Sequence, residues 1–223
     1  TVTLTVTDDN GCIHTTTQTI IVRPNPIADF TATEACVGFP TVFTDLSSII
    51  SPLGGNIISW DWDFGDGPPP GTSTDQDPNY TYTNAGTYTV NLTVTDDNGC
   101  QGYATEIITV LTLPTADFTA TEECLGDLTV FTDASTDGSG TIISWDWDFG
   151  DPAGGTSTLT NPTYTYANQG TYIVTLTVTD DNGCIHTTTQ TIIVRPNPIA
   201  DFTATEVCVG FPTVFTDLST IVS

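Results

Sequence analysis

Carboxylates are the most abundant groups in this sequence that could do chemistry, since it holds 27 Asp and Glu residues. Three of them, Asp61, Asp63 and Asp66, lie close together and are followed by Gly67. An EF-hand calcium loop needs the order Asp-x-Asp-x-Asp-Gly between two helices, and this run has one extra residue and alternates like a strand. A glycosidase acid pair needs a cleft, which one strand does not provide. We expect Asp66 to cap a turn through its side chain.

Nucleophilic catalysis lacks the residues that it requires. The two histidines, His14 and His186, occupy the same position in two copies of a repeat, and no lysine is present. No serine motif accompanies either histidine, so no nucleophile–base pair is evident. The six cysteines lack C-x-x-C spacing, which disfavours zinc and thioredoxin-like chemistry. We predict that the chain is not an enzyme and requires no cofactor.

The charge balance restricts the possible partners. The formal net charge is −25, with Arg23 and Arg195 as the only basic side chains besides the histidines. Nucleic acids need Lys and Arg for their phosphates, so we exclude them as partners. Anionic membrane surfaces are disfavoured for the same reason. No apolar run is long enough to insert into a membrane. The charge favours bound cations or simply a solvated acidic surface.

Two repeated strings define the organisation of the chain. The string LTVTDDNGC ends at Cys12, Cys100 and Cys184, with spacings of 88 and 84 residues. The string ADFTATE precedes the other three cysteines with the same spacings. The unit is therefore a module of about 85 residues. Residues 2–51 also match residues 174–223 at all but three positions, which gives a super-repeat of two modules.

The repeat divides the chain into four parts. Residues 24–111 and 112–195 are expected to be complete modules. Residues 1–23 match the C-terminal part of a module, and residues 196–223 match the N-terminal part of another. We expect the sequence to be a stretch of a longer array.

The polarity pattern within a module predicts strands. Residues 87–95 alternate between apolar and polar side chains, and residues 58–65 do the same. The sequence Asp97-Asn98-Gly99 is a strong hairpin signal. No segment has helical periodicity, and six or seven short strands in such a module predict an all-β sandwich. The apolar face of the second segment should carry Ile58, Trp60, Trp62 and Phe64.

Three motifs resemble those of the PKD (polycystic kidney disease) domain family. They are WDFGDG at 62–67, NPTYTY at 161–166 and AGTYTVNLTVTD at 85–96. The second complete module keeps WDFGD but has Pro152 where the first has Gly67. The resemblance implies tandem immunoglobulin-like sandwiches in extracellular or cell-surface proteins, where they serve as spacers, adhesive stalks or carbohydrate-associated modules. Arrays of this kind with paired cysteines look like those of bacterial surface proteins.

Two classes of function remain open at this stage. Near-identical modules joined by proline-containing linkers at 111–114 and 195–198 favour a stiff structural fibre or stalk. Its partners would be neighbouring modules and further copies of the chain. The alternative is an adhesive or polysaccharide-binding array with glycans as partners. That reading needs exposed paired aromatics, whereas the tryptophans lie on an apolar stripe and are expected in the core.

Carboxylates at the module junctions are candidate cation ligands. Strand-end and hairpin acids should lie at the pole where the preceding module enters, and the preceding module should contribute a glutamate. Ca²⁺ or another hard cation would neutralise them, and the alternative is a water-solvated acidic rim. The candidates are Asp45, Asp96, Asp97, Asp133, Asp180, Asp181, Glu34 and Glu122.

The cysteines allow two pairings. Cys36, Cys124 and Cys208 should lie between the first two strands of a module, and Cys12, Cys100 and Cys184 just after its last hairpin turn. Pairing within a module would join Cys36 to Cys100 and Cys124 to Cys184. A strand of about seven residues would separate those positions by roughly 20 Å, whereas a disulfide needs Cα atoms within about 7 Å. The alternative is a staple between modules, Cys36 to Cys184, and free thiols are the third possibility.

Two sequons could carry N-linked glycans. Asn79 begins NYT and Asn91 begins NLT, and Asn91 should lie on the polar face of its strand. Asn161 is followed by proline and is excluded. Chance sequons are common, so glycosylation stays a hypothesis.

Overall fold

The fold is all β, as the alternation predicts. A computed structural model describes residues 1–50 and 55–221, and these residues contain no helix. The described part of the chain therefore has no helix that could cross a membrane. The chain divides into two compact units, Thr1–Val110 and Leu111–Ser223, and each unit contains one sandwich.

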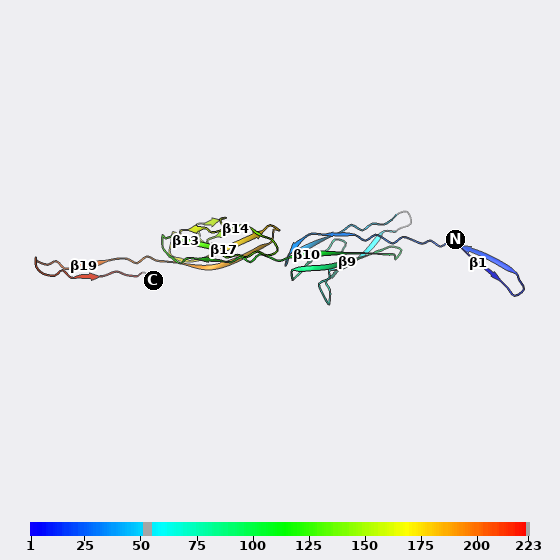
Figure 1. Cartoon of the computed structure of the whole chain (residues 1–223), viewed down its shortest axis with the longest axis horizontal. Coiled ribbons are helices and arrows are strands. Elements are labelled where there is room, and N and C mark those ends of the chain that lie inside the picture. The colour runs from blue at the N-terminus through cyan, green and yellow to red at the C-terminus, as the bar shows by residue number, and fades with distance from the viewer. Residues whose placement is uncertain (51–54, 222–223) are drawn as a thin grey trace. The chain divides into compact units, whose positions relative to one another are not determined.

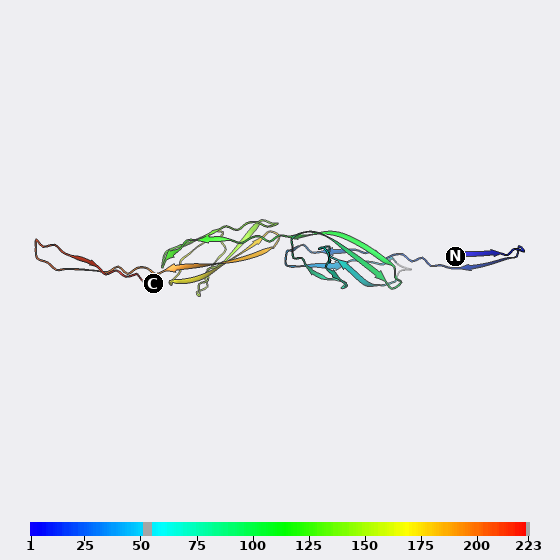
Figure 2. The same ribbon diagram turned by 90° about the horizontal axis from the view of Figure 1, so that it is seen from below.

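The first sandwich pairs a five-stranded sheet with a three-stranded one. The larger sheet has the order β4-β10-β9-β6-β7 and the smaller one β3-β5-β8. The long hairpin strands β9 and β10 lie side by side in Figures 1 and 2. The bounds of the eight strands are β3 Phe30–Ala32, β4 Ala35–Cys36, β5 Pro40–Asp45, β6 Ile57–Asp63, β7 Thr72–Ser73, β8 Asn79–Thr81, β9 Gly86–Asp96 and β10 Gln101–Leu111.

The second sandwich repeats this topology strand for strand. Its sheets have the orders β12-β18-β17-β14-β15 and β11-β13-β16. In each larger sheet one short strand pairs with the last long strand: β4 with β10 in the first sandwich, and β12 with β18 in the second. The bounds are β11 Phe118–Ala120, β12 Glu123–Cys124, β13 Thr129–Asp133, β14 Ile142–Asp148, β15 Thr156–Ser157, β16 Thr163–Tyr164, β17 Gly170–Asp180 and β18 Ile185–Arg195.

Alternating side chains of the long central strand fill each core. In β9, Val90, Leu92 and Val94 have no exposed surface, which confirms the predicted inward face. Trp62 is also completely buried, and its ring lies 5.0 Å from that of Phe30 in an edge-on arrangement. Burying several large apolar side chains in each module is the main stabilising term of the fold.

One predicted core position is wrong. Ile58 is 62% exposed, and Ile57 packs against the core instead. The register between β6 and β9 shifts between Ile57 and Ser59, which marks a β-bulge. A bulge adds one residue to a strand, so side chains before it change faces. The second module repeats the shift, and Ile143 is exposed there while Ile142 is buried.

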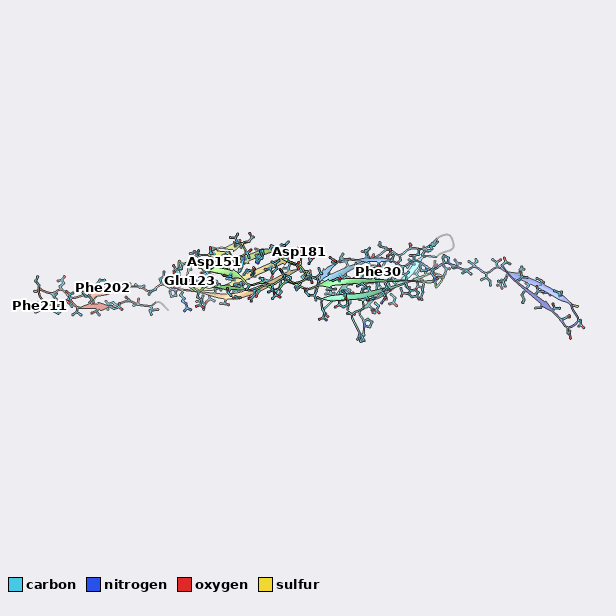
Figure 3. All side chains as sticks on the ribbon, in the orientation of Figure 1. Phe30, Glu123, Asp151, Asp181, Phe202 and Phe211 are labelled. Atoms are coloured by element: carbon cyan, nitrogen blue, oxygen red, sulfur yellow. The ribbon has the colours of Figure 1, made fainter. Side chains whose placement is uncertain are left out.

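Two further hairpins flank the sandwiches in sequence. They are β1 Val2–Thr7 with β2 Ile13–Gln18, and β19 Phe202–Ala204 with β20 Phe215–Asp217. Their apolar side chains are exposed, including Leu4 at 59% and Phe202 at 65%. Figure 3 labels Phe202 on β19. These hairpins therefore form strands but no core of their own.

Candidate functional sites at the turns and strand ends

The turn after β6 is organised by a carboxylate, as expected for Asp66. Its Oδ1 accepts the Gly71 amide at 2.6 Å, and its Oδ2 accepts the hydroxyl of Tyr80. The Gly71 amide and the Tyr80 hydroxyl together lower the pKa of Asp66. The same hydrogen bond, with desolvation, raises the pKa of Tyr80 to about 12. Asp66 therefore has a structural role in this turn.

The second module rebuilds this turn with a different loop. Asp151 Oδ1 accepts the Ala153 amide and Oδ2 accepts the Tyr164 hydroxyl, both at 2.9 Å (Figure 3 shows Asp151). Desolvation and the bond to Asp151 raise the pKa of Tyr164. Pro152 replaces Gly67 without loss of the carboxylate–phenol bond, so the departure from the motif changes only the local loop.

Asp45, a candidate cation ligand, ends β5 and binds protein groups with both oxygens. Its Oδ2 accepts the indole N–H of Trp60 at 2.8 Å, and its Oδ1 accepts the Ser47 amide at 3.0 Å. Asp133 makes the matching bonds to Trp145 and Ser135 in the second module. These bonds explain why Trp60 and Trp145 are only half-buried, because each indole reaches a carboxylate at the strand end.

The hairpin acids Asp96 and Asp180 are buried and shape their own turns. Asp96 Oδ1 accepts the amides of Asn98 at 2.9 Å and Cys100 at 2.8 Å. Burial opposes its ionisation, but the amides of Cys100 and Asn98 outweigh that effect and lower the pKa of Asp96. Asp180 Oδ1 accepts the corresponding amides of Asn182 and Cys184, while its Oδ2 is buried and has no hydrogen-bond partner among the described residues.

The neighbouring acids Asp97 and Asp181 stabilise the loop that faces the hairpin. Asp181 Oδ1 accepts the Thr141 amide at 2.9 Å (Figure 3 shows Asp181). Asp97 Oδ2 accepts the side-chain amide of Asn56 at 3.5 Å. These carboxylates again act as acceptors for protein donors.

The glutamates of the proposed cation set have other neighbours within their own modules. Glu122 pairs with Arg195, and both side chains are exposed. Glu34 lines a groove beside β10. Among residues 1–50 and 55–221, no three His, Cys, Asp or Glu side chains gather in a group that could hold a metal ion. The cation site that combines two modules stays a prediction.

Two of the six cysteines are disulfide-bonded, namely Cys36 and Cys184. The other four, Cys12, Cys100, Cys124 and Cys208, are free thiols. Neither pairing within a module is therefore present. In the second module Cys124 lies opposite Arg195, and Cys184 precedes β18. The 11 residues of that strand separate the two cysteines by about 36 Å, a larger distance than the roughly 20 Å expected from the sequence.

The two sequon asparagines lie on exposed positions of strands. Asn79 begins β8, and Asn91 in β9 accepts the hydroxyl of Thr105 through Oδ1 at 2.8 Å. Both sites are accessible, and glycosylation itself stays a prediction.

His186 has the structural role predicted for the histidines. Its Nδ1 accepts the backbone N–H of Ala116 at 2.9 Å and so ties β18 to the segment before β11. Gly102 occupies the same position of the first module, where an added Cβ would collide with the carbonyl of Pro26. The two modules thus hold their first strands by different contacts.

Comparison with known families agrees with this geometry. The family model described as "PKD domain" matches residues 23–110 and 112–194. The chain belongs to the PKD domain family. Its two matched regions cover both sandwiches.

Relatives of these PKD domains occur in much larger bacterial proteins. The chain is 47% identical over 77 residues to the pre-pro-metalloprotease PrtV of Vibrio cholerae and 46% identical over 67 residues to a microbial collagenase of Vibrio alginolyticus. These matches cover 34% and 30% of the chain and 8% of each relative. The chain therefore spans less than a tenth of these relatives.

Two solved structures are similar to parts of this chain. The PKD1 domain of the Vibrio cholerae metalloprotease PrtV is 45% identical, covers 37% of this chain and 96% of that domain, and has a TM-score of 0.34. A structure of fibronectin(III)-like modules of Clostridium thermocellum CbhA is 15% identical, over 75% of this chain and 95% of that one, with a TM-score of 0.38.

The sequence did not reveal every group that builds these PKD sites. Tyr80 and Tyr164 complete the carboxylate turns, and the only signal was their place in the shared P-x-Y-T-Y string. Gln190 in β18 and Glu106 in β10 occupy equivalent positions, and neither was predicted as a site residue from the sequence. Their contacts depend on the distance between the two sheets of a sandwich, which a local sequence pattern does not reveal.

Proposed function

We propose that the chain is a structural, non-catalytic part of an extracellular or cell-surface fibre or stalk built from tandem PKD modules. The observation that carries this proposal is the near-identical repetition of one sandwich along the chain, with a two-module super-repeat. The acidic side chains at the turns accept hydrogen bonds from the protein itself, which supports a scaffold role rather than a reaction.

The partners in this proposal are neighbouring modules and further copies of the chain. A disulfide from Cys36 to Cys184 would staple one module to the next. The disulfide-bonded state of both cysteines supports it, as does the separation of the cysteines within a module. An extracellular location fits an oxidised cysteine pair and relatives among bacterial proteases and collagenases.

Small-angle scattering and negative-stain microscopy test the structural role. A compact protein of 223 residues has a radius of gyration of about 17 Å. We expect a value well above that figure and fibres in the micrographs. A compact radius together with dispersed particles would contradict the proposal.

One observation favours the alternative of glycan binding. Tyr103 is 69% exposed on β10, and its hydroxyl donates to Gln101 at 2.7 Å. An exposed aromatic ring on a sheet face can stack on a sugar ring. Co-sedimentation with insoluble cellulose and chitin tests this role, and binding that is lost in Tyr103→Ala would support it.

A further inference from the structure

The first strand of the first sandwich has an open edge. β3 is the outer strand of its sheet, and within residues 1–50 and 55–221 it pairs only with β5. The amide of Thr33 donates to Val42 at 3.0 Å, and the carbonyl of Asp29 accepts from Leu46 at 2.8 Å. Bonding alternates along an antiparallel strand. Phe30 and Ala32 must therefore direct their N–H and C=O groups away from β5, toward the edge.

The second sandwich closes the same edge with a side chain. Gln190 of β18 donates through Nε2 to the carbonyl of Phe118 at 2.5 Å and to Asp117 Oδ1 at 3.3 Å. Phe118 is the counterpart of Phe30. The glutamine therefore bridges the two sheets and occupies the outward-facing carbonyl.

Glu106 stands at the position of Gln190 in the first sandwich. An ionised carboxylate has no proton to donate, so it cannot bridge to the carbonyl of Phe30. No hydrogen bond within the described residues joins Glu106 to β3. A groove of about 420 Å³ lies there instead, lined by residues 30–34 and 106–109. We name it the β3 groove; Figure 3 labels Phe30 on its β3 wall.

We propose that the β3 groove binds an extended basic segment of another protein by strand addition. The outward N–H and C=O groups of Phe30 and Ala32 would pair with its main chain. Glu34 and Glu106 line the groove and would pair with its Lys or Arg side chains. The groove volume falls in the range of ordinary ligand sites.

Charge decides what kind of partner fits. The chain has no lysine, and Arg195, one of its two arginines, already pairs with Glu122. An acidic segment of a second copy, from a chain without lysine, would be a poor occupant of this acidic groove, although other surfaces could still join copies in a fibre. The occupant is therefore a cationic segment from a different protein. This proposal is independent of the fibre role and could fail without affecting it.

Fluorescence anisotropy with the whole chain tests the proposal. The probe is a fluorescein-labelled octapeptide of alternating lysine and valine, at about 0.15 M salt. We expect Glu106→Gln to weaken binding at least tenfold, because a glutamine can bridge to the Phe30 carbonyl as Gln190 does to Phe118. Glu106→Ala, which leaves the edge open, should weaken it less. Asp127→Asn removes one charge outside the groove and should bind like the wild type.

A gain-of-function variant and a modified peptide sharpen the result. Gln190→Glu should open the second sandwich and raise the stoichiometry from one peptide to two. A peptide with N-methyl groups on alternate residues keeps its charge but loses main-chain donors, and it should not bind. Absence of peptide binding, or equal affinities for Glu106→Gln, Asp127→Asn and the wild type, would overturn the proposal. So would unchanged binding of the N-methylated peptide, since that indicates only non-specific attraction.

Discussion

The carboxylates of this chain act mainly as hydrogen-bond acceptors. Asp66 accepts a backbone amide and a phenol, Asp45 accepts an indole and an amide, and Asp96 accepts two amides of its own turn. Turns and strand ends leave amides without sheet partners, and charged acceptors bind such donors strongly. Acidic composition at these positions therefore reflects turn construction and is not by itself a sign of metal binding.

The Asp66–Tyr80 pair predicts a pH-dependent term in stability. The pKa of Asp66 is lowered, so its contribution is present above about pH 4 and is lost as the pH falls through the lowered pKa. The pKa of Tyr80 is raised to about 12, so its contribution holds below pH 10 and is lost between pH 10 and about 12. The variant Tyr80→Phe removes the hydroxyl that donates this hydrogen bond to Asp66.

We therefore expect the stability difference between wild type and Tyr80→Phe to be largest from about pH 4 to 10. Denaturant unfolding across the pH range measures it. Both proteins share the global effect of the acidic surface, so the difference isolates the pair. A difference that stays constant from pH 3 to pH 11 would contradict the assignment.

The Asp45–Trp60 bond predicts a second effect at a single residue. Asp45→Asn weakens the charged acceptor of the Trp60 indole, and we expect a loss of about 1–2 kcal/mol in the free energy of unfolding. Asp61→Asn is the matched control, because Asp61 lies exposed on β6 and should change stability by less than about 0.5 kcal/mol. Equal effects of both variants would show that only net charge matters.

The elements themselves were largely predictable from local patterns. The alternation at residues 87–95 predicted which side chains of β9 face the core and which face solvent. The Asp-Asn-Gly sequence predicted the hairpin between β9 and β10. The inward position of Ile57 was missed, because a bulge changes the face of a strand without changing its composition. The indole and phenol contacts of the acids were missed as well, since they join segments far apart in the sequence.

A glycine in the turn after β6 lies very close to the backbone of β9. Gly65 has a φ of +72°, and a Cβ there would collide with the backbone carbonyl of Thr89 in β9. Gly67 has a φ of +114°, but space around it is open. We expect Gly67→Ala to lose about 1–3 kcal/mol through backbone strain and Gly65→Ala to lose clearly more.

Thermal melting of both variants measures how much the collision adds to the backbone strain. Gly67→Ala has the strain alone, and Gly65→Ala has both the strain and the collision. The two glycines lie in one turn, so local effects of the alanine side chain on the unfolded chain are similar. If both variants melted at the same temperature, the close approach between the turn and β9 would not limit stability.

At the scale of the whole molecule, two kinds of module alternate. One ties its first strand by His186 and closes its edge by Gln190, whereas the other has Gly102 and Glu106 at these positions. The super-repeat is visible in the sequence, but the consequences of these substitutions require coordinates. The functional unit of the array is therefore better regarded as a pair of modules than as a single one.

Calcium remains a prediction at this scale, since its proposed ligands come from two modules. If a hard cation neutralises carboxylates at the junctions, a chelator should lower the melting temperature and added Ca²⁺ should restore it. Asp97→Asn should abolish that response, while Asp127→Asn should preserve it. A melting temperature that does not change with chelator would contradict cation binding at the junctions.

We predict that Cys36 and Cys184 pair with each other and so join two modules. The protease that cleaves before aspartate places the six cysteines on six separate peptides, with Cys36 in residues 29–44 and Cys184 in residues 181–200. Under non-reducing conditions we expect these two peptides to be linked and the other four cysteines to react with iodoacetamide. The staple should contribute about 2–4 kcal/mol, so Cys36→Ser should unfold at lower denaturant, whereas Cys124→Ser should not. A link from residues 29–44 to residues 97–116, which contain Cys100, would contradict the staple and establish pairing within the module.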